Sequence, residues 1–567
     1  MSHSRWQVAP RISQEQVARF SSVLQTGSPE LMAQLLYNRG VVEPEHIDSF
    51  LAADERLVND PFLLPDMDKA VSRIYRALLS GESIAIFGDF DVDGITATTL
   101  LVEGLSGLGG QVLPYIPHRT EEGYGINEPA VERLAQQGIT LIVTVDCGIS
   151  AAPEVLAARR LGIDVVVTDH HTVPPELPSA VAVVDAKRPD SAYPFSDLAG
   201  VGVAFKLIQA LYSYIGKNAD MEPYLDLVAL GTVADMVSLL GENRFLVKKG
   251  LNEMRFTKRV GLIELAKSAG VPISSVDSEI ISWYLAPRLN AAGRLDHAGV
   301  GLRLLSTSSQ DDAQNLAAIL DRKNLERQKV TEHILAKARE QLGHVSPEFP
   351  LIMVGGEDFH SGVVGVAAGR LVEEYCRPTV VFERGREWSR GSARSIPGFS
   401  IIAALSQCGD ILYKYGGHPM AAGFTIATKN LEKLQGKLVE IASSQLSPHN
   451  LCHLINIDAE VVLSSLRGDT FKMVQKLSPF GSGNSHPTFL ARNAAVEDCR
   501  SVGSKGEHLK LKLKDNGVIW NGISFKKGNL IGEITPRLDI VFNLEVDHWA
   551  GGGTLQLNIL DFAPATR

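Results

Sequence analysis

Acidic residues and histidines recur in this sequence directly after runs of β-branched residues. The stretches are SIAIFGDFDVDG with Asp89, Asp91 and Asp93, TLIVTVDCG with Asp146, and DVVVTDHH with Asp169, His170 and His171. Asp235 lies in the apolar stretch ALGTVADMV. A lone Asp after a strand is usually a turn or helix-cap residue. Side chains that follow several strands of one parallel sheet, however, meet in the crevice at its carboxyl edge.

So many carboxylates in one crevice would repel one another unless cations lay between them. Carboxylates suit Mg²⁺ and Mn²⁺, and imidazole accepts the softer first-row metals, so the mixed set favours Mn²⁺ over Mg²⁺. Two such ions held ~3.5–4 Å apart clamp the attacking and leaving oxygens of a phosphoryl displacement. The sequence therefore predicts metal-assisted hydrolysis at phosphorus.

Other common phosphate and hydrolase motifs are absent from the sequence. AGVGVAFK offers two glycines but has Phe205 where a dinucleotide fingerprint needs Gly or Ala. There is no G-x-x-x-x-G-K-[ST] phosphate loop and no G-x-S-x-G elbow. These absences exclude the usual dinucleotide, NTP and serine-hydrolase sites.

The elements around the acidic motifs alternate between strand and helix patterns from about residue 83 to 185. Helix-like intervals at 94–109, 127–137 and 151–161 separate β-rich runs, which is typical of a doubly wound parallel sheet. A mostly helical stretch follows to about 310, and 311–343 predicts one long connecting helix. A second α/β unit begins at PLIMVGG and ends near 446.

The C-terminal part has strand patterns and turn dipeptides. In LKLKLK, leucines 509, 511 and 513 alternate with Lys510, Lys512 and Lys514, which predicts leucines in a core and lysines on one outer face. A small β-barrel with a basic face is compatible with an oligonucleotide-binding fold. A solvated strand with ordinary surface lysines explains this segment equally well.

Size and composition are those of a globular protein with three or four domains. Its 567 residues are 45% hydrophobic and 21% charged, and the net charge of −10 argues against general nucleic-acid affinity but not against a local basic groove. The five cysteines form no C-x-x-C, which indicates a reducing compartment and argues against a cysteine zinc site. The start has no apolar signal region, so we expect a cytoplasmic protein without a membrane segment.

The motifs D-F-D-V-D-G, V-D-C-G, T-D-H-H and G-T-V-A-D, in this order, resemble the DHH phosphoesterase superfamily. EEGYGIN, LAGVGVAFKL, APRLNAAGRL, FHSGVVGVAAGRL, RGSARSI and GGHPMAAGF extend the likeness to its bacterial single-strand-specific exonucleases, densely over residues 60–425. PFGSGNSHPTF is similar to the start of that family's oligonucleotide-binding domain. The implied fold is α/β: a parallel-sheet DHH domain and a smaller α/β DHH-associated domain joined by a long helix, with a C-terminal oligonucleotide-binding β-barrel. The expected ranges are 1–50 (N-terminal segment without a usable motif), 51–310 (DHH), 311–345 (helix), 346–450 (DHH-associated) and 451–567 (barrel).

The resemblance also implies a set of metal ligands. They are Asp89, Asp91, Asp93, Asp146, His170 and Asp235. Asp146 would bridge two ions, and Asp169 would orient a histidine, as metal-bound imidazoles usually require. His171 would donate a hydrogen bond to the scissile phosphate. Cys147, where relatives often have Asn, is interpreted as packing because no basic neighbour suggests a thiolate.

Strand contacts come from elsewhere in the chain. By resemblance, Arg119, Tyr124, Ser392 and Arg394 would hold the 5′ end, and Arg288, Asn290 and Arg294 look like a phosphate-binding loop beside the metals, with a catalytic role for Arg288. His418 would lean over the active site from the second domain. For each arginine an exposed salt bridge is the alternative.

The function implied is a 5′-to-3′ exonuclease on single-stranded DNA, dependent on two Mn²⁺ or Mg²⁺ ions, in repair and recombination. The family suggests single-strand-binding protein and a helicase as partners, and we expect a monomer. One alternative is a phosphodiesterase on short oligonucleotides or cyclic dinucleotides, whose relatives are shorter and lack the barrel. Another is a non-catalytic scaffold like the DHH relative of the eukaryotic replicative helicase, which has lost ligands that this sequence keeps.

Overall fold

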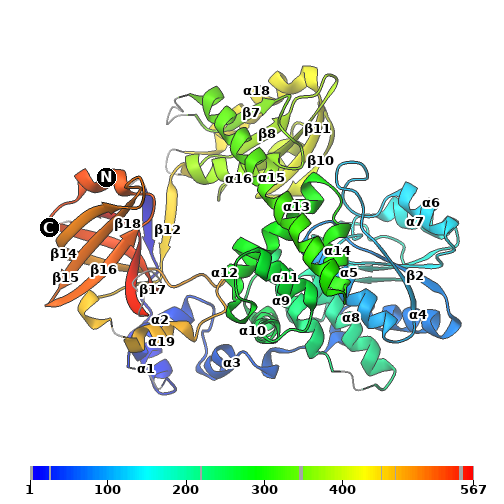
Figure 1. Ribbon diagram of the computed structural model, residues 1–567, viewed down its shortest axis with the longest axis horizontal. Coiled ribbons are helices and arrows are strands. Elements are labelled where there is room, and N and C mark those ends of the chain that lie inside the picture. Colours follow the sequence, from blue (N-terminus) through cyan, green and yellow to red (C-terminus); the bar gives the residue numbers. More distant parts are fainter. Residues whose placement is uncertain are drawn as a thin grey trace. The chain divides into compact units, whose positions relative to one another are not determined.

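The computed structural model describes residues 4–24, 27–217, 220–343, 349–447, 450–466, 468–547 and 553–565. The chain forms two compact units (Figure 1). One joins Met1–Arg56 to Cys452–Arg567, and the other is Leu57–Leu451. We call them the barrel unit and the catalytic unit. None of the described helices combines the length and the apolar character that crossing a membrane requires.

The catalytic unit begins with a five-stranded parallel sheet in the order β3-β2-β4-β5-β6. Its strands are β2 (Ser83–Phe87), β3 (Gln111–Tyr115), β4 (Leu141–Thr144), β5 (Asp164–Thr168) and β6 (Ala182–Val184). Helices α4 (Met67–Ser80), α5 (Val92–Ser106) and α8 (Gly200–Tyr214) share a core with one face. Helices α6 (Glu128–Gln136) and α7 (Ala152–Arg160) cover the other. The doubly wound sheet predicted from the sequence is therefore confirmed.

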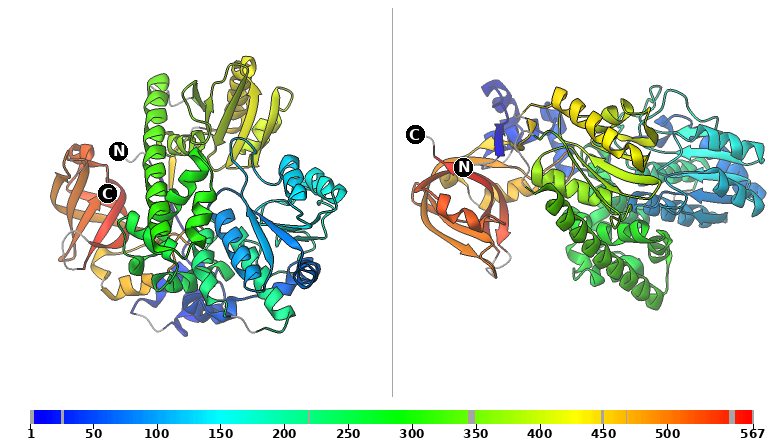
Figure 2. Two further views of the ribbon diagram at one scale, coloured as in Figure 1. Left: turned by 45° about the vertical axis from the view of Figure 1, so that its right-hand side comes forward. Right: turned by 90° about the horizontal axis from the view of Figure 1, so that it is seen from above.

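A helical region follows and positions several site residues. It contains α9 (Leu225–Ala234), α10 (Gly241–Arg255), α11 (Val260–Ser268), α13 (Ala286–Leu295) and α14 (Gly299–Ser306). The long helix α15 spans Gln310–Leu342, with the Ser309 hydroxyl capping its first turn. It packs on α11 and α13 at one end and on α16 (Val364–Tyr375) at the other, so it connects the two α/β parts of this unit (Figures 1 and 2).

The second α/β part has a mixed sheet in the order β10-β11-β9-β8-β7. Its strands are β7 (Ile352–Gly356), β8 (Thr379–Glu383), β9 (Trp388–Arg394), β10 (Leu412–His418) and β11 (Ala421–Ala427). Helix α16 (Val364–Tyr375) packs with α15 on one face, and α17 (Ile401–Ser406) and α18 (Leu431–Gln445) cover the other.

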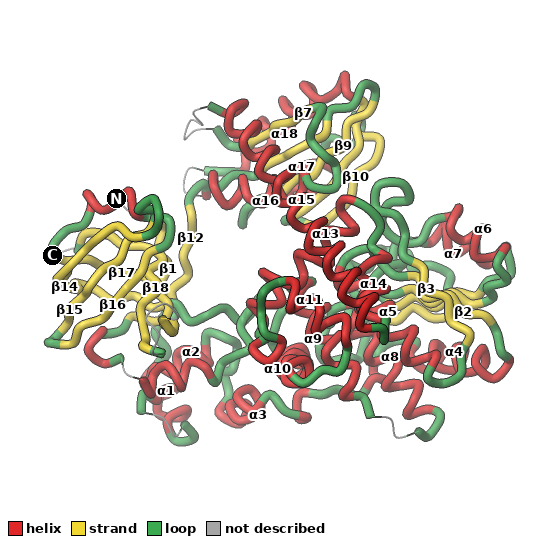
Figure 3. The backbone as a smooth tube through the Cα atoms, in the orientation of Figure 1, coloured by secondary structure: helices red, strands yellow, loops and turns green. Residues whose placement is uncertain are grey.

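In the barrel unit five strands form a closed barrel. The barrel can be followed in the right-hand view of Figure 2 and among the yellow strands of Figure 3. Its strands are β14 (Phe489–Val502), β15 (His508–Asp515), β16 (Val518–Ser524), β17 (Arg537–Asp547) and β18 (Thr554–Pro564). The order β14-β15-β16-β18-β17 closes because β17 also pairs with β14. Leu509, Leu511 and Leu513 are fully buried, so the predicted alternation in β15 is confirmed.

The N-terminal residues, for which the sequence predicted no role, belong to the same unit as the barrel. Strand β1 (Ser4–Val8) pairs in parallel with β12 (His453–Ile457), and the Trp6 indole donates to Asp561 at 2.9 Å. The buried guanidinium of Arg39 donates to Asn484 at 2.8 Å and to Asp458 at 3.2 Å. The two ends of the chain therefore stabilise each other.

Candidate active site

The acidic motifs meet at the carboxyl edge of the parallel sheet. Asp89 follows β2, Asp146 follows β4, and the Asp169–His171 triplet follows β5. Asp93 lies in the first turn of α5, and Asp235 is the C-cap of α9 rather than a residue within the helix. The structure thus brings the predicted ligands together.

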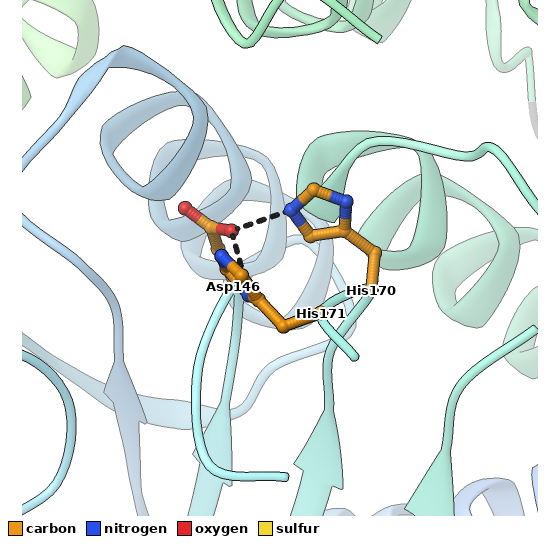
Figure 4. A group of neighbouring side chains, drawn as sticks. All are labelled: Asp146, His170 and His171. Carbon is orange, nitrogen blue, oxygen red and sulfur yellow. Dashed lines mark hydrogen bonds and ion pairs between the residues drawn. The ribbon is translucent and has the colours of Figure 1, made fainter. Parts of the chain in front are cut away.

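Three groups of side chains are close enough to share an ion. They are Asp146 with His170 and His171, Asp93 with His170 and Asp235, and Asp89 with Asp91 and Asp146. Figure 4 shows one carboxylate oxygen of Asp146 facing both imidazoles. His170 Nε2 lies 3.0 Å from Asp146 Oδ1, and it is 3.6 Å from Asp235 Oδ2 and 3.7 Å from Asp93 Oδ2.

Local backbone geometry fixes these carboxylates. Asp91 caps α5 by accepting from the amides of Asp93 and Gly94. Asp93 in turn accepts from the amides of Gly200 and Val201, at 2.6 and 2.8 Å, at the start of α8. The positive end of that helix therefore holds an acidic side chain. A Cβ on Gly200 would lie 2.6 Å from the Cβ of Asp146, so only glycine allows this approach.

Asp146 has a left-handed backbone, with a φ of 59°. Such a conformation is uncommon for a residue other than glycine, and it costs free energy unless the surroundings impose it. Here it occurs at one of the two residues, Asp146 and His170, that each belong to two of the three groups. The strain is thus located at the centre of the cluster.

The cluster is electrostatically suited to cations. Burial, followed by the charge of Asp93, raises the pKa of Asp146 well above its usual range, and burial and Asp91 do the same for the pKa of Asp89. Asp89 Oδ1 is buried without a hydrogen-bond partner. Burial also lowers the pKa of His170 to about 3, which keeps the imidazole neutral and able to coordinate. Carboxylates that repel one another around a neutral imidazole fit Mn²⁺ or Mg²⁺.

Asp169 holds His171 rather than an ion. Its Oδ1 lies 2.7 Å from His171 Nδ1, and its oxygens accept from the amides of Ile149, His170 and His171. Although burial lowers the pKa of His171, the bond to Asp169 and nearby carboxylates raise it to about 9. His171 is therefore a positively charged imidazole beside the carboxylates.

Tyr124 lies at the centre of the site, where its hydroxyl donates to the Asp146 carbonyl at 3.0 Å and lies 3.1 Å from His171 Nδ1.

Cys147 is fully buried, and burial raises the pKa of its thiol well above the usual range. Cys147 thus packs as a neutral thiol, as expected.

Two residues of the site escaped the sequence reasoning. Asp185 follows β6 at the same edge of the sheet and is fully buried, with one carboxylate oxygen unpartnered. Lys187 donates through its ammonium group to the His170 carbonyl. Asp185 could have been found from the sequence, because in AVAVVDAK it follows a β-rich run as the other acidic residues do.

Several arginines converge beside the carboxylates. The Arg119 guanidinium lies 4.5 Å from the centre of the Phe90 ring, close to the charges of Asp89 and Asp91. Arg294 is partly buried, and burial, followed by the charges of Arg119, Arg327 and Arg394, lowers its pKa to about 9. Arg394 donates to the Ser392 hydroxyl at 3.0 Å. Guanidinium groups that lower one another's pKa form a site that favours a multiply charged anion. Arg327 is the member that the sequence analysis did not identify.

The expected phosphate-binding loop around APRLNAAGR is instead the helix α13. Arg288 lies on the side of α13 opposite Asn290, because two residues advance 200° around a helix. Arg288 binds Asp321 at 2.9 Å and the Tyr284 carbonyl, whereas Asn290 accepts from the Val92 amide of the first acidic motif. The structure therefore brings Asn290 and Arg294 to the site and pairs Arg288 with Asp321 of α15. The catalytic role expected of Arg288 stays a prediction.

His418 reaches the site from the second α/β part. It ends β10, and its ring centroid lies 6.0 Å from that of His171. Within the catalytic unit, the two α/β parts therefore both contribute to one site.

Comparison with known families identifies the class of protein. The model of the DHH family, N-terminal domain, matches residues 83–232, and those of the DHHA1 domain and the RecJ OB domain match 348–444 and 457–561. The fold and the site are thus those of a DHH-family protein.

Individual relatives narrow this class. The single-stranded-DNA-specific exonuclease RecJ of Bacillus subtilis is 38% identical over 99% of this chain and 71% of its own length. RecJ of Dickeya dadantii is 34% identical over 94% and 95% of the two chains. The Thermus thermophilus RecJ structure with Mn²⁺ matches with a TM-score of 0.87 and 30% identity, over all of this chain and 80% of that one. A structure of the same protein with Mg²⁺ has a TM-score of 0.81. The chain belongs to the RecJ family.

Proposed function

We propose that this protein hydrolyses single-stranded DNA from its 5′ end with two divalent cations. The observation that carries the proposal is the carboxylate cluster around Asp146 beside the arginines around Arg294. Relatives named as single-stranded-DNA-specific exonucleases over nearly the whole chain support the substrate class.

The ions would be held by Asp89, Asp91, Asp93, Asp146, His170 and Asp235. When bound, they supply an activated water and neutralise charge that develops on the phosphate. The chain's own residues do the positioning. Asp169 fixes the ring of His171, and the protonated His171 donates to a non-bridging phosphate oxygen. The Tyr124 hydroxyl lies 3.1 Å from Nδ1 of the same ring and restricts it further.

The 5′-to-3′ direction of hydrolysis would come from a group of residues that we call the arginine pocket. Its members are Arg119, Arg294, Ser392 and Arg394. A terminal 5′ phosphate carries nearly two negative charges and accepts several hydrogen bonds. Guanidinium forks match that geometry. Because Arg119 lies near Asp89 and Asp91, a phosphate in this pocket places the next phosphodiester close to the cations. Only a strand that enters by its 5′ end then satisfies both sites.

The barrel would retain the downstream strand, as oligonucleotide-binding folds do on the face of their second and third strands. In this barrel that face is β15 and β16, where Lys510 and Lys512 point outward. Lys514 differs, because it is paired with Glu497 at 2.7 Å. The basic surface is therefore concentrated at the Lys510 end. Association with single-strand-binding protein or a helicase, and a monomeric state, stay expectations of the family.

The substrate class can be tested directly. Matched labelled oligonucleotides of single-stranded DNA, duplex DNA and single-stranded RNA are incubated with Mn²⁺, with Mg²⁺ or with chelator. We expect rapid loss of the single-stranded DNA with either metal and none with chelator. Equal hydrolysis of duplex, or activity in chelator, contradicts the proposal.

A further inference from the structure

Part of one face of the sheet in the second α/β part is exposed, over β10, β11 and the Trp388 end of β9, while α16 packs against the Arg394 end of β9. Ala393 of β9 and Ala422, Phe424 and Ile426 of β11 are buried in the core beneath α17 and α18. Because side chains alternate along a strand, the residues between them point to the opposite side. We call this side the open face.

The strand register arranges the open face in rows. The first row is Arg394, Ala421 and His418, which runs from the arginine pocket to the ring beside His171. The second row is Ser392, Gly423 and Gly416. Its two glycines leave a shallow floor.

Two more rows continue away from the site. The third contains Arg390, Thr425 and Lys414. The Arg390 guanidinium reaches the Thr120 carbonyl, so the open face is next to the loop that carries Arg119. Lys414 has no ion-pair partner in the part of the chain that the structure describes. A cation without a counter-charge at this point favours an anionic ligand.

The fourth row is aromatic. Trp388 lies beside Ala427 and packs against Tyr413 of the neighbouring edge, with ring centroids 5.0 Å apart and planes at 56°. Both rings are at the surface, where 49% of Trp388 and 74% of Tyr413 is exposed. Six residues of antiparallel strand separate Trp388 from Arg394, or about 20 Å. Exposed aromatic rings beside unpaired cations are what single-stranded nucleic acids stack on.

We propose that Trp388 and Tyr413 form a stacking platform for a base near the 5′ end of the bound strand, with Lys414 contacting its backbone. The inference rests on the proposed function, because it assigns the occupant of the open face as the substrate strand. It is continuous with the site through a single strand, β9, which carries Arg394, Ser392, Arg390 and Trp388 on one side. The platform would hold the DNA strand in an extended conformation between the two aromatic rings and the cations.

A stacking platform contributes to binding and not to the chemical step. Base stacking on an aromatic side chain is worth about 1–3 kcal/mol, which corresponds to about five-fold to 150-fold in affinity. The double variant Trp388→Ala/Tyr413→Ala should therefore raise KM for a long oligonucleotide by that range and leave kcat within about two-fold. Trp388→Phe/Tyr413→Phe keeps two rings and should keep most of the affinity. Phe256→Ala, at another ring that is 76% exposed, is the matched control.

Binding can be read without hydrolysis. Oligonucleotides with a single 2-aminopurine at successive positions from the 5′ end are titrated with the protein in chelator. We expect the fluorescence at one or two adjacent positions to be quenched by wild type and by the Phe/Phe variant, and to be unchanged by the Ala/Ala variant. Thermal unfolding of each variant checks that the fold is intact.

The outcomes separate the two claims. If wild type degrades single-stranded DNA but the Ala/Ala variant has the wild-type KM and quenching, the platform is wrong and the proposed function stands. If wild type has no nuclease activity, the proposed function fails, and position-specific quenching still decides whether the open face binds a strand. If the Ala/Ala variant lowers kcat with no change in KM, the two rings do not act by binding, and the inference is overturned.

Discussion

The imidazole of His418 lies nearly parallel to that of His171, with 12° between the ring planes, although the two residues come from different α/β parts of the catalytic unit. The His171 ring is hydrogen-bonded to Asp169, whereas His418 is exposed on the edge strand β10. Burial, and then the charges of His171 and Lys187, lower the pKa of His418. His418 is therefore a neutral imidazole that lies next to the charged imidazole of His171.

This relationship predicts that His418 contributes to the hydrolytic step rather than to metal binding. His418→Ala should lower kcat by about tenfold, the worth of one hydrogen bond of about 1.4 kcal/mol. Mn²⁺ affinity, measured by calorimetry, should not change. A variant that loses Mn²⁺ binding instead would make His418 a ligand and contradict this assignment.

Asp146→Asn should abolish hydrolysis to below a few per cent of wild type, because two of the three ligand groups share this carboxylate. The same variant should raise the unfolding temperature in chelator, since it removes one of several buried carboxylates that repel one another. It should also lose the stabilisation that added Mn²⁺ gives to wild type. Asp410→Asn, on the surface of the second α/β part, is the control. A full Mn²⁺-dependent rise in the Asp146→Asn protein would exclude the shared-ligand role.

The stability of the metal-free protein should fall as pH rises. Burial and neighbouring carboxylates raise the pKa of Asp93 to about 7 and that of Asp235 to about 9, from 3.8 for an ordinary Asp. Between pH 3.8, the ordinary pKa of Asp, and about pH 9, the folded state binds more protons than the unfolded state. The free energy of unfolding therefore decreases as pH rises through this range. Thermal unfolding in chelator at about pH 5.5 and about pH 8.5 measures the effect. Mn²⁺ should reduce the difference; equal melting temperatures in chelator at both pH values would show that the carboxylates do not repel.

Sequence reasoning placed most of the proposed ligands together because Asp89, Asp146 and His170 each follow a strand of one parallel sheet, where topology alone forces side chains to meet. Asp235 is different, because it is the C-cap of α9. Sequence reasoning took the helix α13 for a loop, and helical periodicity turns Arg288 away from Asn290. Arg327 could not be found, since its approach to Arg294 depends on how α15 packs. Nor could the pairing of β1 with β12, which joins segments about 450 residues apart. A chain cut near residue 450 therefore loses the partner of its N-terminal segment as well as the barrel.

Arg394→Ala should lower the rate mainly on substrates with a 5′ phosphate. Arg394 is partly buried, donates to the Ser392 hydroxyl and lies close to Arg119, so an entering anion would meet two neighbouring guanidinium groups. We expect wild type to prefer a 5′-phosphorylated oligonucleotide over its 5′-hydroxyl counterpart and the variant to lose about tenfold or more of that preference, as for one charge-assisted hydrogen bond. Arg386→Ala, on the exposed turn before β9, is the matched control. If Arg394→Ala slows both substrates equally, the pocket does not recognise the terminal phosphate.

Lys510 should matter more for DNA binding than Lys514. Lys510 lies opposite Arg500 on β14, whereas Lys514 is neutralised by Glu497. Each phosphate contact that is lost reduces the slope of log affinity against log salt by about 0.7 for a single strand. Lys510→Ala should show that change in a fluorescence-anisotropy titration, and Lys514→Ala should leave the slope at its wild-type value. The opposite order would mean that the other end of β15 contacts the strand.

The position of the arginine pocket beside the carboxylates predicts that hydrolysis proceeds from the 5′ end of the strand. One time course tests this direction. A 5′-phosphorylated single-stranded oligonucleotide labelled at its 3′ end is incubated with the protein and Mn²⁺, in parallel with the same oligonucleotide labelled at its 5′ phosphate. The account predicts that the 3′ label passes through a ladder of progressively shorter fragments while the 5′ label is released at once as a mononucleotide. A ladder of shortened fragments that retain the 5′ label, with the 3′ label released first, would contradict it.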